Sequence, residues 1–342
     1  MSFVQYAKQI IRPGAADTLS EDDAHDLFCA MLDGGVPDLE LGAMLAALRL
    51  RGETAAELLG FQRAVSERLY GLQRPDRATA PLVVPALGGA REEPNLLALI
   101  GLLLRRLGVP ILFHGTLEGG GRIASVYVLR EFGIMPSASL GQAQAMLEEE
   151  SIAFVPTAVL CPGLATVLAL RNRMGVRSSA HVVAKLLDPF AGEGVLMLGS
   201  SQPAQLERLG TVLASTGARA LLLASTEGEP FAHPRRRPRM EFLDQGERIV
   251  LFEEEVGPVK PVSGLPAAID AHTTAAWMRH ALAGETPIPH PLVNQLACCL
   301  YACGYTDDMN QAKAIAAVEA GSLAHSGRRR AATARPQGTA PR

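Results

Sequence analysis

Two glycine-rich turns in this sequence have residue types that could bind an anion. The first contains Gly88-Gly89, and the second runs from His114-Gly115 to Arg122. Paired glycines let backbone N–H groups point at an anion, and a following helix adds the positive end of its dipole. Turns that follow neighbouring parallel strands converge on one crevice. An anion site is therefore predicted here, with ordinary tight turns as the alternative. The predicted ligands are Gly88, Gly89, Asn95, His114, Gly115 and Arg122.

Basic side chains gather in two further segments. Residues 171–185 combine three arginines and a lysine with serine and histidine, which are side chains used to recognise phosphate. Residues 234–239 hold four arginines and two prolines, so this segment is predicted to be extended on the surface rather than helical. Solvated surface is one interpretation of both segments, and contact with nucleic acid is the other. The predicted nucleic-acid ligands are Arg171, Arg173, Arg177, Lys185, Arg235, Arg236, Arg237 and Arg239.

Cysteine usage and hydropathy indicate the compartment. The five cysteines are odd in number and lack Cys-x-x-Cys spacing, which favours a reducing environment over a disulfide framework. Cys298, Cys299 and Cys303 share one apolar pattern and are predicted to be buried thiols rather than metal ligands. The longest apolar run, near 96–104, is shorter than a membrane span, and the N-terminus is unlike a signal peptide. We predict a cytoplasmic protein without a membrane partner or a cofactor.

The frame that positions these segments is predicted to have two parts. Up to about residue 70 the apolar residues recur at helical spacing, whereas from residue 81 short apolar runs alternate with glycine turns and helices. This pattern predicts an α/β fold: a small N-terminal all-helical domain plus a larger α/β domain whose central, mostly parallel sheet is flanked by helices. The predicted domains are 1–75, 76–325, parts of which can return to the helical domain, and a disordered basic tail at 326–342.

Two stretches of the sequence resemble anthranilate phosphoribosyltransferase. They are residues 19–65, which include LGAMLAALR followed by RGET, and residues 294–324. The resemblance extends over roughly residues 5–325. It implies the two-part fold described above, with dimerisation through the helical domain. It also implies a reaction on phosphoribosyl diphosphate that needs magnesium.

The catalytic motifs of that family are altered here. The diphosphate loop Gly-Thr-Gly-Gly-Asp corresponds to residues 86–90, which read ALGGA, and Asn-x-Ser-Thr corresponds to residues 95–98, which read NLLA. Lys-His-Gly-Asn-Arg corresponds to FHGT at 113–116, and the Asp-Glu metal pair only to Glu227 and Glu229. The loss of each such electrostatic group commonly raises the activation barrier by a few kcal/mol. Phosphoribosyl transfer by the family's mechanism is therefore expected to be very slow. Magnesium is expected only if the enzymatic interpretation holds.

Three further segments are similar to the YbiB-type, TrpD-like branch of this superfamily. They are RSSAH at 177–181, KLLDPF at 185–190 and TEGEP at 226–230. The branch implies a homodimer that binds DNA or RNA without evident transferase activity. Our main prediction is therefore a nucleic-acid-binding protein with sequence-independent backbone contacts. The alternatives are a phosphoribosyltransferase with altered acceptor specificity, and a relic fold kept for protein–protein contact.

Overall fold

The N-terminal part of the protein is helical. The computed structural model describes residues 2–11, 18–259, 261–262 and 264–321, so the predicted basic tail lies outside the described residues. The first helices are α1 (Phe3–Ile11), α2 (Glu21–Leu32), α3 (Asp38–Arg51) and α4 (Ala55–Ser66). Ser20 caps α2, and Thr54 forms a capping box with Glu57 at the start of α4. Phe28 stacks on Phe61 with ring centroids 4.6 Å apart, which fixes α2 against α4.

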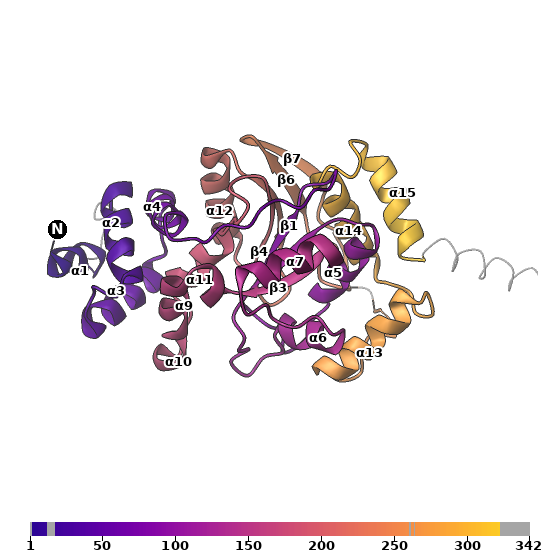
Figure 1. Ribbon diagram of the computed structural model, residues 1–342, viewed down its shortest axis with the longest axis horizontal. Helices are drawn as coiled ribbons and strands as arrows, with labels where there is room; N and C mark the ends of the chain where they lie inside the picture. Colours follow the sequence, from indigo (N-terminus) through magenta and orange to yellow (C-terminus); the bar gives the residue numbers. More distant parts are fainter. Residues whose placement is uncertain (1, 12–17, 260, 263, 322–342) are drawn as a thin grey trace, which may run out of the picture.

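A mixed sheet forms the centre of the larger part (Figure 1). Its spatial order is β3-β2-β1-β4-β5-β6-β7, in which the first five strands are parallel and β6 and β7 are antiparallel. The strands are β1 (Leu82–Ala86), β2 (Ile111–Gly115), β3 (Ile152–Pro156), β4 (Val195–Ser200), β5 (Arg219–Ala224), β6 (Met240–Asp244) and β7 (Glu247–Phe252). The predicted fold class is confirmed. The chain order reverses between β1 and β4, where crevices form in such sheets.

Helices cover both faces of this sheet. One face is covered by α5 (Leu97–Arg106), α6 (Ser125–Glu131), α13 (Ala271–Leu282), α14 (His290–Ala302) and α15 (Met309–Glu319). The other is covered by α7 (Leu140–Glu150), α8 (Thr157–Leu160), α9 (Pro162–Ala169), α11 (Ser179–Val183) and α12 (Pro203–Thr216), with α10 (Arg171–Met174) and the 3-10 helix η1 (Ala184–Leu186) beside them. On this second face the apolar residues of α2–α4 join the sheet in one continuous core. In the described part of the chain, no helix is both long and apolar enough to cross a membrane.

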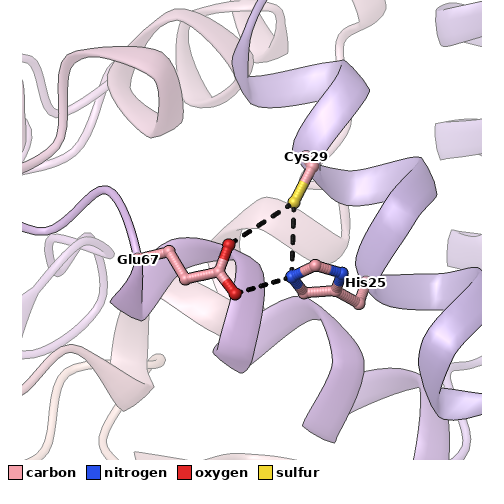
Figure 2. Close-up of side chains that lie close together, drawn as sticks. All are labelled: His25, Cys29 and Glu67. Carbon is pink, nitrogen blue, oxygen red and sulfur yellow. Dashed lines mark hydrogen bonds and ion pairs between the residues drawn. The ribbon is translucent and has the colours of Figure 1, made fainter.

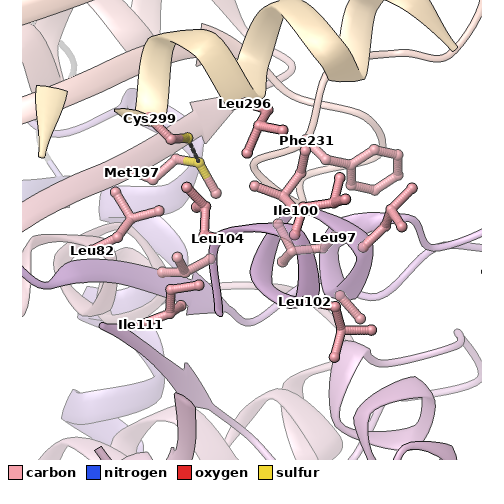
Figure 3. Packing of buried hydrophobic residues seen from close by; sticks show 14 of the residues in the cluster. Leu82, Leu97, Ile100, Leu102, Leu104, Ile111, Met197, Phe231, Leu296 and Cys299 are labelled. Atoms are coloured by element: carbon pink, nitrogen blue, oxygen red, sulfur yellow. Dashed lines mark hydrogen bonds between the residues drawn. The ribbon is translucent and has the colours of Figure 1, made fainter. Parts of the chain in front are cut away.

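Aliphatic and sulfur-containing side chains fill the first face. Figure 3 shows Leu104 of α5 near Leu82 of β1, with Met197 of β4 beneath Cys299 of α14. All five cysteines are free thiols, and the three on or next to α14 are buried, as predicted. With few aromatics, this dense aliphatic packing holds the strand ends in fixed positions.

Candidate anion-binding site

The structure brings the two glycine turns together at the carboxyl ends of β1 and β2. The N–H of Ala90 donates to the carbonyl of Ile123 at 3.0 Å, and the N–H of Ile123 donates back to Ala90 at 2.8 Å. At the end of β2, a Cβ on Gly115 would lie 2.0 Å from the backbone oxygen of Ala86, so only glycine fits. The β1 and β2 ends therefore approach more closely than side chains would allow.

The carboxylate of Glu229, a residue of the same chain, already occupies the first glycine turn. The N–H groups of Gly88 and Gly89 donate to Oε1 of Glu229 at 2.5 and 2.6 Å. Ser125 donates its hydroxyl to Oε2 of the same carboxylate at 2.8 Å. Glu229 is completely buried. Burial raises the pKa of its carboxyl, and the donors from Ser125 and the two glycines oppose that shift.

Glu227 binds the backbone just beyond this turn. Its carboxylate accepts N–H groups from Arg91, Glu92 and Glu93 at 2.8 to 3.1 Å. It also pairs with Nη1 of Arg122 at 3.2 Å. Burial alone would raise the pKa of Glu227, but the three backbone donors and Arg122 bring it below its usual value. Both carboxylates predicted as metal ligands are therefore directed at N–H donors within the chain, an arrangement that does not suit magnesium.

The buried polar side chains under the turns are mainly structural. Asn95 donates to the carbonyl of Ile123 at 2.9 Å and to the hydroxyl of Ser125 at 3.0 Å, and its Oδ1 accepts the N–H of Leu97. His114 is completely buried, and neither ring nitrogen has a hydrogen-bond partner among the described residues. Burial lowers the pKa of His114 to about 4. Of the predicted anion ligands, these two lie beneath the crevice rather than on its surface.

A polar cavity of about 110 Å³ lies beside Gly88, where the sheet order reverses. Its cations are Arg49 of α3, Arg177 just before α11 and Lys185 of η1. No carboxylate is among its described lining residues, which otherwise include the serines and glutamines that follow β4. Nζ of Lys185 donates to the carbonyl of Gly199 at 2.7 Å, and Nη2 of Arg177 donates to the carbonyl of Gly88 at 3.1 Å. Both cations are thus held in place by backbone oxygens.

The positive charge around this cavity is poorly compensated. Burial lowers the pKa of Arg177, and the charges of Arg171 and Arg122 lower it further. Burial followed by the charge of Arg177 lowers the pKa of Lys185 to about 8, while Glu229 acts in the opposite direction. Among the described residues, neither Arg177 nor Lys185 has a carboxylate within ion-pair distance. Mutual repulsion of this kind is relieved by an incoming anion.

A second cavity, of about 310 Å³, lies against the other glycine turn. Gly115, Gly120, Thr157 and Arg171 line it, and His181 lines both cavities. Nδ1 of His181 accepts the N–H of Ser178 at 3.2 Å, and burial, followed by the nearby arginines, lowers the pKa of His181 to about 3. The imidazole between the two cavities is therefore neutral.

The arginines of residues 235–239 are tied to acidic residues and carbonyl groups within the chain. Arg235 pairs with Glu93, and Arg239 pairs with Glu241 at 2.8 Å. Arg236 donates to the carbonyl of Gly257. Arg237 donates to the carbonyl of Glu253, and its guanidinium lies over the ring of Phe252. The segment is a turn whose side chains are mostly half-buried, rather than an extended solvated run. Arg173, by contrast, is exposed and forms an ion pair with an exposed acid of α3.

Comparison with known proteins identifies the family. Residues 5–68 match the model of the glycosyl transferase family, helical bundle domain. The uncharacterized protein YbiB of Escherichia coli (strain K12) is 42% identical over 306 residues, which are 89% of this chain and 95% of that protein. The chain belongs to the YbiB-type branch of the TrpD-like superfamily. The anthranilate phosphoribosyltransferase of Methanopyrus kandleri is 27% identical over 285 residues, covering 82% of this chain and 84% of that one.

Solved structures show the same fold. Anthranilate phosphoribosyltransferase (TrpD) from Thermus thermophilus matches with a TM-score of 0.73 and 24% identity, covering 94% of this chain and 95% of that one. The Saccharomyces cerevisiae enzyme in complex with PRPP and Mg matches with a TM-score of 0.71 and 14% identity, over 94% and 93% of the two chains. The YbiB-type chain thus keeps the TrpD architecture while filling its first glycine turn with Glu229.

Sequence reasoning misses two contributors to this YbiB-type site. Arg49 lies in the helical domain, and no local motif marks it as part of a cavity in the other domain. The sequence suggests Glu229 only as a metal ligand. Its contact with Gly88 and Gly89 is missed because these partners lie 141 and 140 positions away in the chain. The acidic turn at 226–230 is the sequence feature that could indicate this contact, because a carboxylate can accept hydrogen bonds from the N–H groups of a glycine turn just as a phosphate can.

We expect the free energy of unfolding to fall as the pH is lowered from about 6.5. The folded protein holds His114 and His181 neutral, with pKa values of about 4 and about 3 against an ordinary value of 6.5. The unfolded chain therefore binds protons that the folded chain rejects, and stability present at pH 7 is lost on acidification. Urea denaturation between pH 7 and 4.5 measures the slope. His114→Leu should reduce that slope, and an unchanged slope would contradict the assignment.

Proposed function

We propose that this YbiB-type protein binds nucleic acid through its phosphate backbone and does not transfer phosphoribosyl groups. The proposal rests on a group of cations at the sheet's switch point: the half-buried Arg177 and Lys185 and the exposed Arg49 line a cavity without a carboxylate among its described residues. Arg171 adds a further positive charge from the neighbouring cavity. Cations held by backbone carbonyls and lacking acidic partners favour a phosphate over a neutral ligand.

The arrangement fits a phosphate backbone better than a base. The described lining contains guanidinium, ammonium, hydroxyl and amide groups, and no aromatic ring other than the imidazole of His181. Phosphate contacts of this kind position a polymer without reading its sequence. Binding is therefore expected to be sequence-independent and strongly weakened by salt.

The transferase alternative is favoured by the likeness to anthranilate phosphoribosyltransferases and disfavoured by the site. The backbone donors of the first glycine turn, which would have to cradle a diphosphate, are taken by Glu229. Glu227, the other candidate for the metal, is taken by three N–H groups and Arg122. Release of diphosphate from phosphoribosyl diphosphate, dependent on magnesium and on an aromatic amine or nucleobase, would support the alternative.

We expect a cytoplasmic homodimer that associates through the helical domain. Dimerisation would place two cation-lined crevices on one particle, so one nucleic-acid chain that contacts both would bind with higher avidity than a chain that contacts one.

A backbone-neutralised oligonucleotide tests the proposal directly. Fluorescence anisotropy would compare a labelled single-stranded DNA with a methylphosphonate analogue of the same sequence. We expect the natural strand to bind and the uncharged analogue to bind at least about tenfold more weakly, since the removed phosphates supply the electrostatic attraction. Equal affinity for both strands would refute a phosphate-based contact.

A further inference from the structure

Three potential metal ligands converge in the helical domain, away from the crevice. His25 and Cys29 lie one turn apart on α2, and Glu67 follows the last residue of α4. Nε2 of His25 is 3.5 Å from Sγ of Cys29 and 2.9 Å from Oε1 of Glu67, and Sγ is 4.0 Å from Oε2 (Figure 2). Within the described residues, this is the one group of three such ligands close enough to share an ion.

One of these separations equals that expected around a tetrahedral zinc ion, and the other two are within about half an ångström of it. Zinc bonds of about 2.0–2.1 Å to nitrogen, 2.3 Å to sulfur and 2.0–2.2 Å to oxygen place tetrahedral ligand atoms about 3.4 to 3.6 Å apart. The observed nitrogen–sulfur distance already has this value. The other two distances run to different oxygens of Glu67, 2.9 Å to Oε1 and 4.0 Å to Oε2, and each lies about half an ångström from the expected value. The Glu67 side chain is half exposed, so a small rotation can present one of its oxygens to the ion.

The residues around the cluster orient it from outside. Nδ1 of His25 faces a carboxylate oxygen of Asp26 at 3.1 Å, which would leave Nε2 free to bind a metal. Nη1 of Arg68 donates to Sγ of Cys29 at 3.2 Å and so orients the sulfur. Arg68 is itself held by two 2.7 Å contacts to Asp33. Supporting contacts of this type accompany the ligands in metal sites.

We propose that His25, Cys29 and Glu67 form a Zn²⁺ site whose fourth position is open to water. Nitrogen, sulfur and oxygen donors together suit zinc better than magnesium or calcium. A bound ion joins α2 to the end of α4 across their packed interface. The inference is independent of nucleic-acid binding, because the ligands belong to the helical domain.

Titration of the untagged full chain with zinc, in competition with a chromophoric chelator, tests the site. We expect one Zn²⁺ per chain, and a Co²⁺ complex with the strong visible bands of tetrahedral geometry and a thiolate charge-transfer band. Cys29→Ala should abolish the charge-transfer band and the tight binding. Asp26→Asn, which changes only the support of His25, should weaken binding about 10- to 100-fold.

His280→Gln serves as the matched control, because His280 also contacts a carboxylate on the surface but lacks a thiol neighbour among the described residues. It should bind zinc like the unchanged protein, and circular dichroism should show that Cys29→Ala remains folded. Failure of the unchanged chain to bind zinc would overturn the proposal. So would an affinity that Cys29→Ala leaves intact, or a loss of affinity in His280→Gln equal to that in Cys29→Ala.

Discussion

Glu229→Ala is expected to lower the free energy of unfolding by about 3–5 kcal/mol, the cost of breaking a buried charged interaction. The substitution leaves the N–H groups of Gly88 and Gly89 and the hydroxyl of Ser125 without their acceptor. It also leaves a cavity where the side chain was, since Glu229 is completely buried. Urea denaturation at pH 7 measures the effect.

The same variant should gain an anion site. With Glu229 removed, the paired glycine N–H groups and Arg177 face an empty space that inorganic diphosphate can enter. Diphosphate should raise the melting temperature of the alanine variant and leave the unchanged protein nearly unaffected. Glu229→Gln, which keeps the shape and one acceptor oxygen, is the control and should respond weakly. Equal stability of the alanine variant and the unchanged protein would show that the carboxylate does not satisfy the turn.

The double variant Arg177→Gln, Lys185→Gln should bind nucleic acid about 30- to 100-fold more weakly at moderate salt, because it neutralises fewer phosphates and so releases fewer counterions. For a single-stranded oligonucleotide, the slope of log affinity against log salt should become shallower by about 1.4, since two phosphate contacts are lost. The free protein should meanwhile become more stable, since both cations are half-buried with lowered pKa values. If the double variant binds nucleic acid more weakly and is also more stable, its loss of binding cannot come from a damaged fold.

The pH dependence of Lys185 gives this variant a second signature. The folded pKa of about 8 lies below the ordinary 10.5, so the folded state disfavours the charged form. The resulting reduction in the free energy of unfolding is complete below pH 8 and disappears as the pH rises towards 10.5. The stability difference between the unchanged protein and Lys185→Gln should therefore shrink over that range. A difference independent of pH would contradict the burial of this charge.

Arg236→Gln, Arg237→Gln is the charge-matched control for the double variant. These two arginines donate to backbone carbonyls near β7 and are absent from the described lining of both cavities. Removing them changes the net charge by the same amount without altering the crevice. If this control weakened binding as much as the crevice variant does, the arginine segment at 235–239 would be the contact surface instead.

The secondary structure and the fold class can be predicted from the sequence because the signals that specify them are local. Alternating apolar runs and glycine turns locate β1, β2, β4 and β5, and capping residues such as Ser20 and Thr54 mark helix starts. The convergence of the two glycine turns also follows from the rule for neighbouring parallel strands. These features depend on backbone periodicity, which a single sequence contains.

The content of the crevice depends on contacts between distant parts of the chain. Arg235 lies 142 positions from its partner Glu93, so its segment resembles free positive charge in the sequence. Glu229 resembles a metal ligand there, because nothing in its turn reveals that Gly88 lies opposite. Side-chain partners of this kind are set by the tertiary packing of loops, for which the sequence carries no periodic signal.

The salt dependence of binding shows whether the cation-lined crevice binds nucleic-acid phosphates, because each phosphate contact releases counterions. Fluorescence anisotropy of a labelled single-stranded oligonucleotide across a series of salt concentrations gives the number of phosphates neutralised. With Arg49, Arg171, Arg177 and Lys185 as contacts, we predict a slope of log affinity against log salt of about −3. A slope near zero would contradict the proposed function.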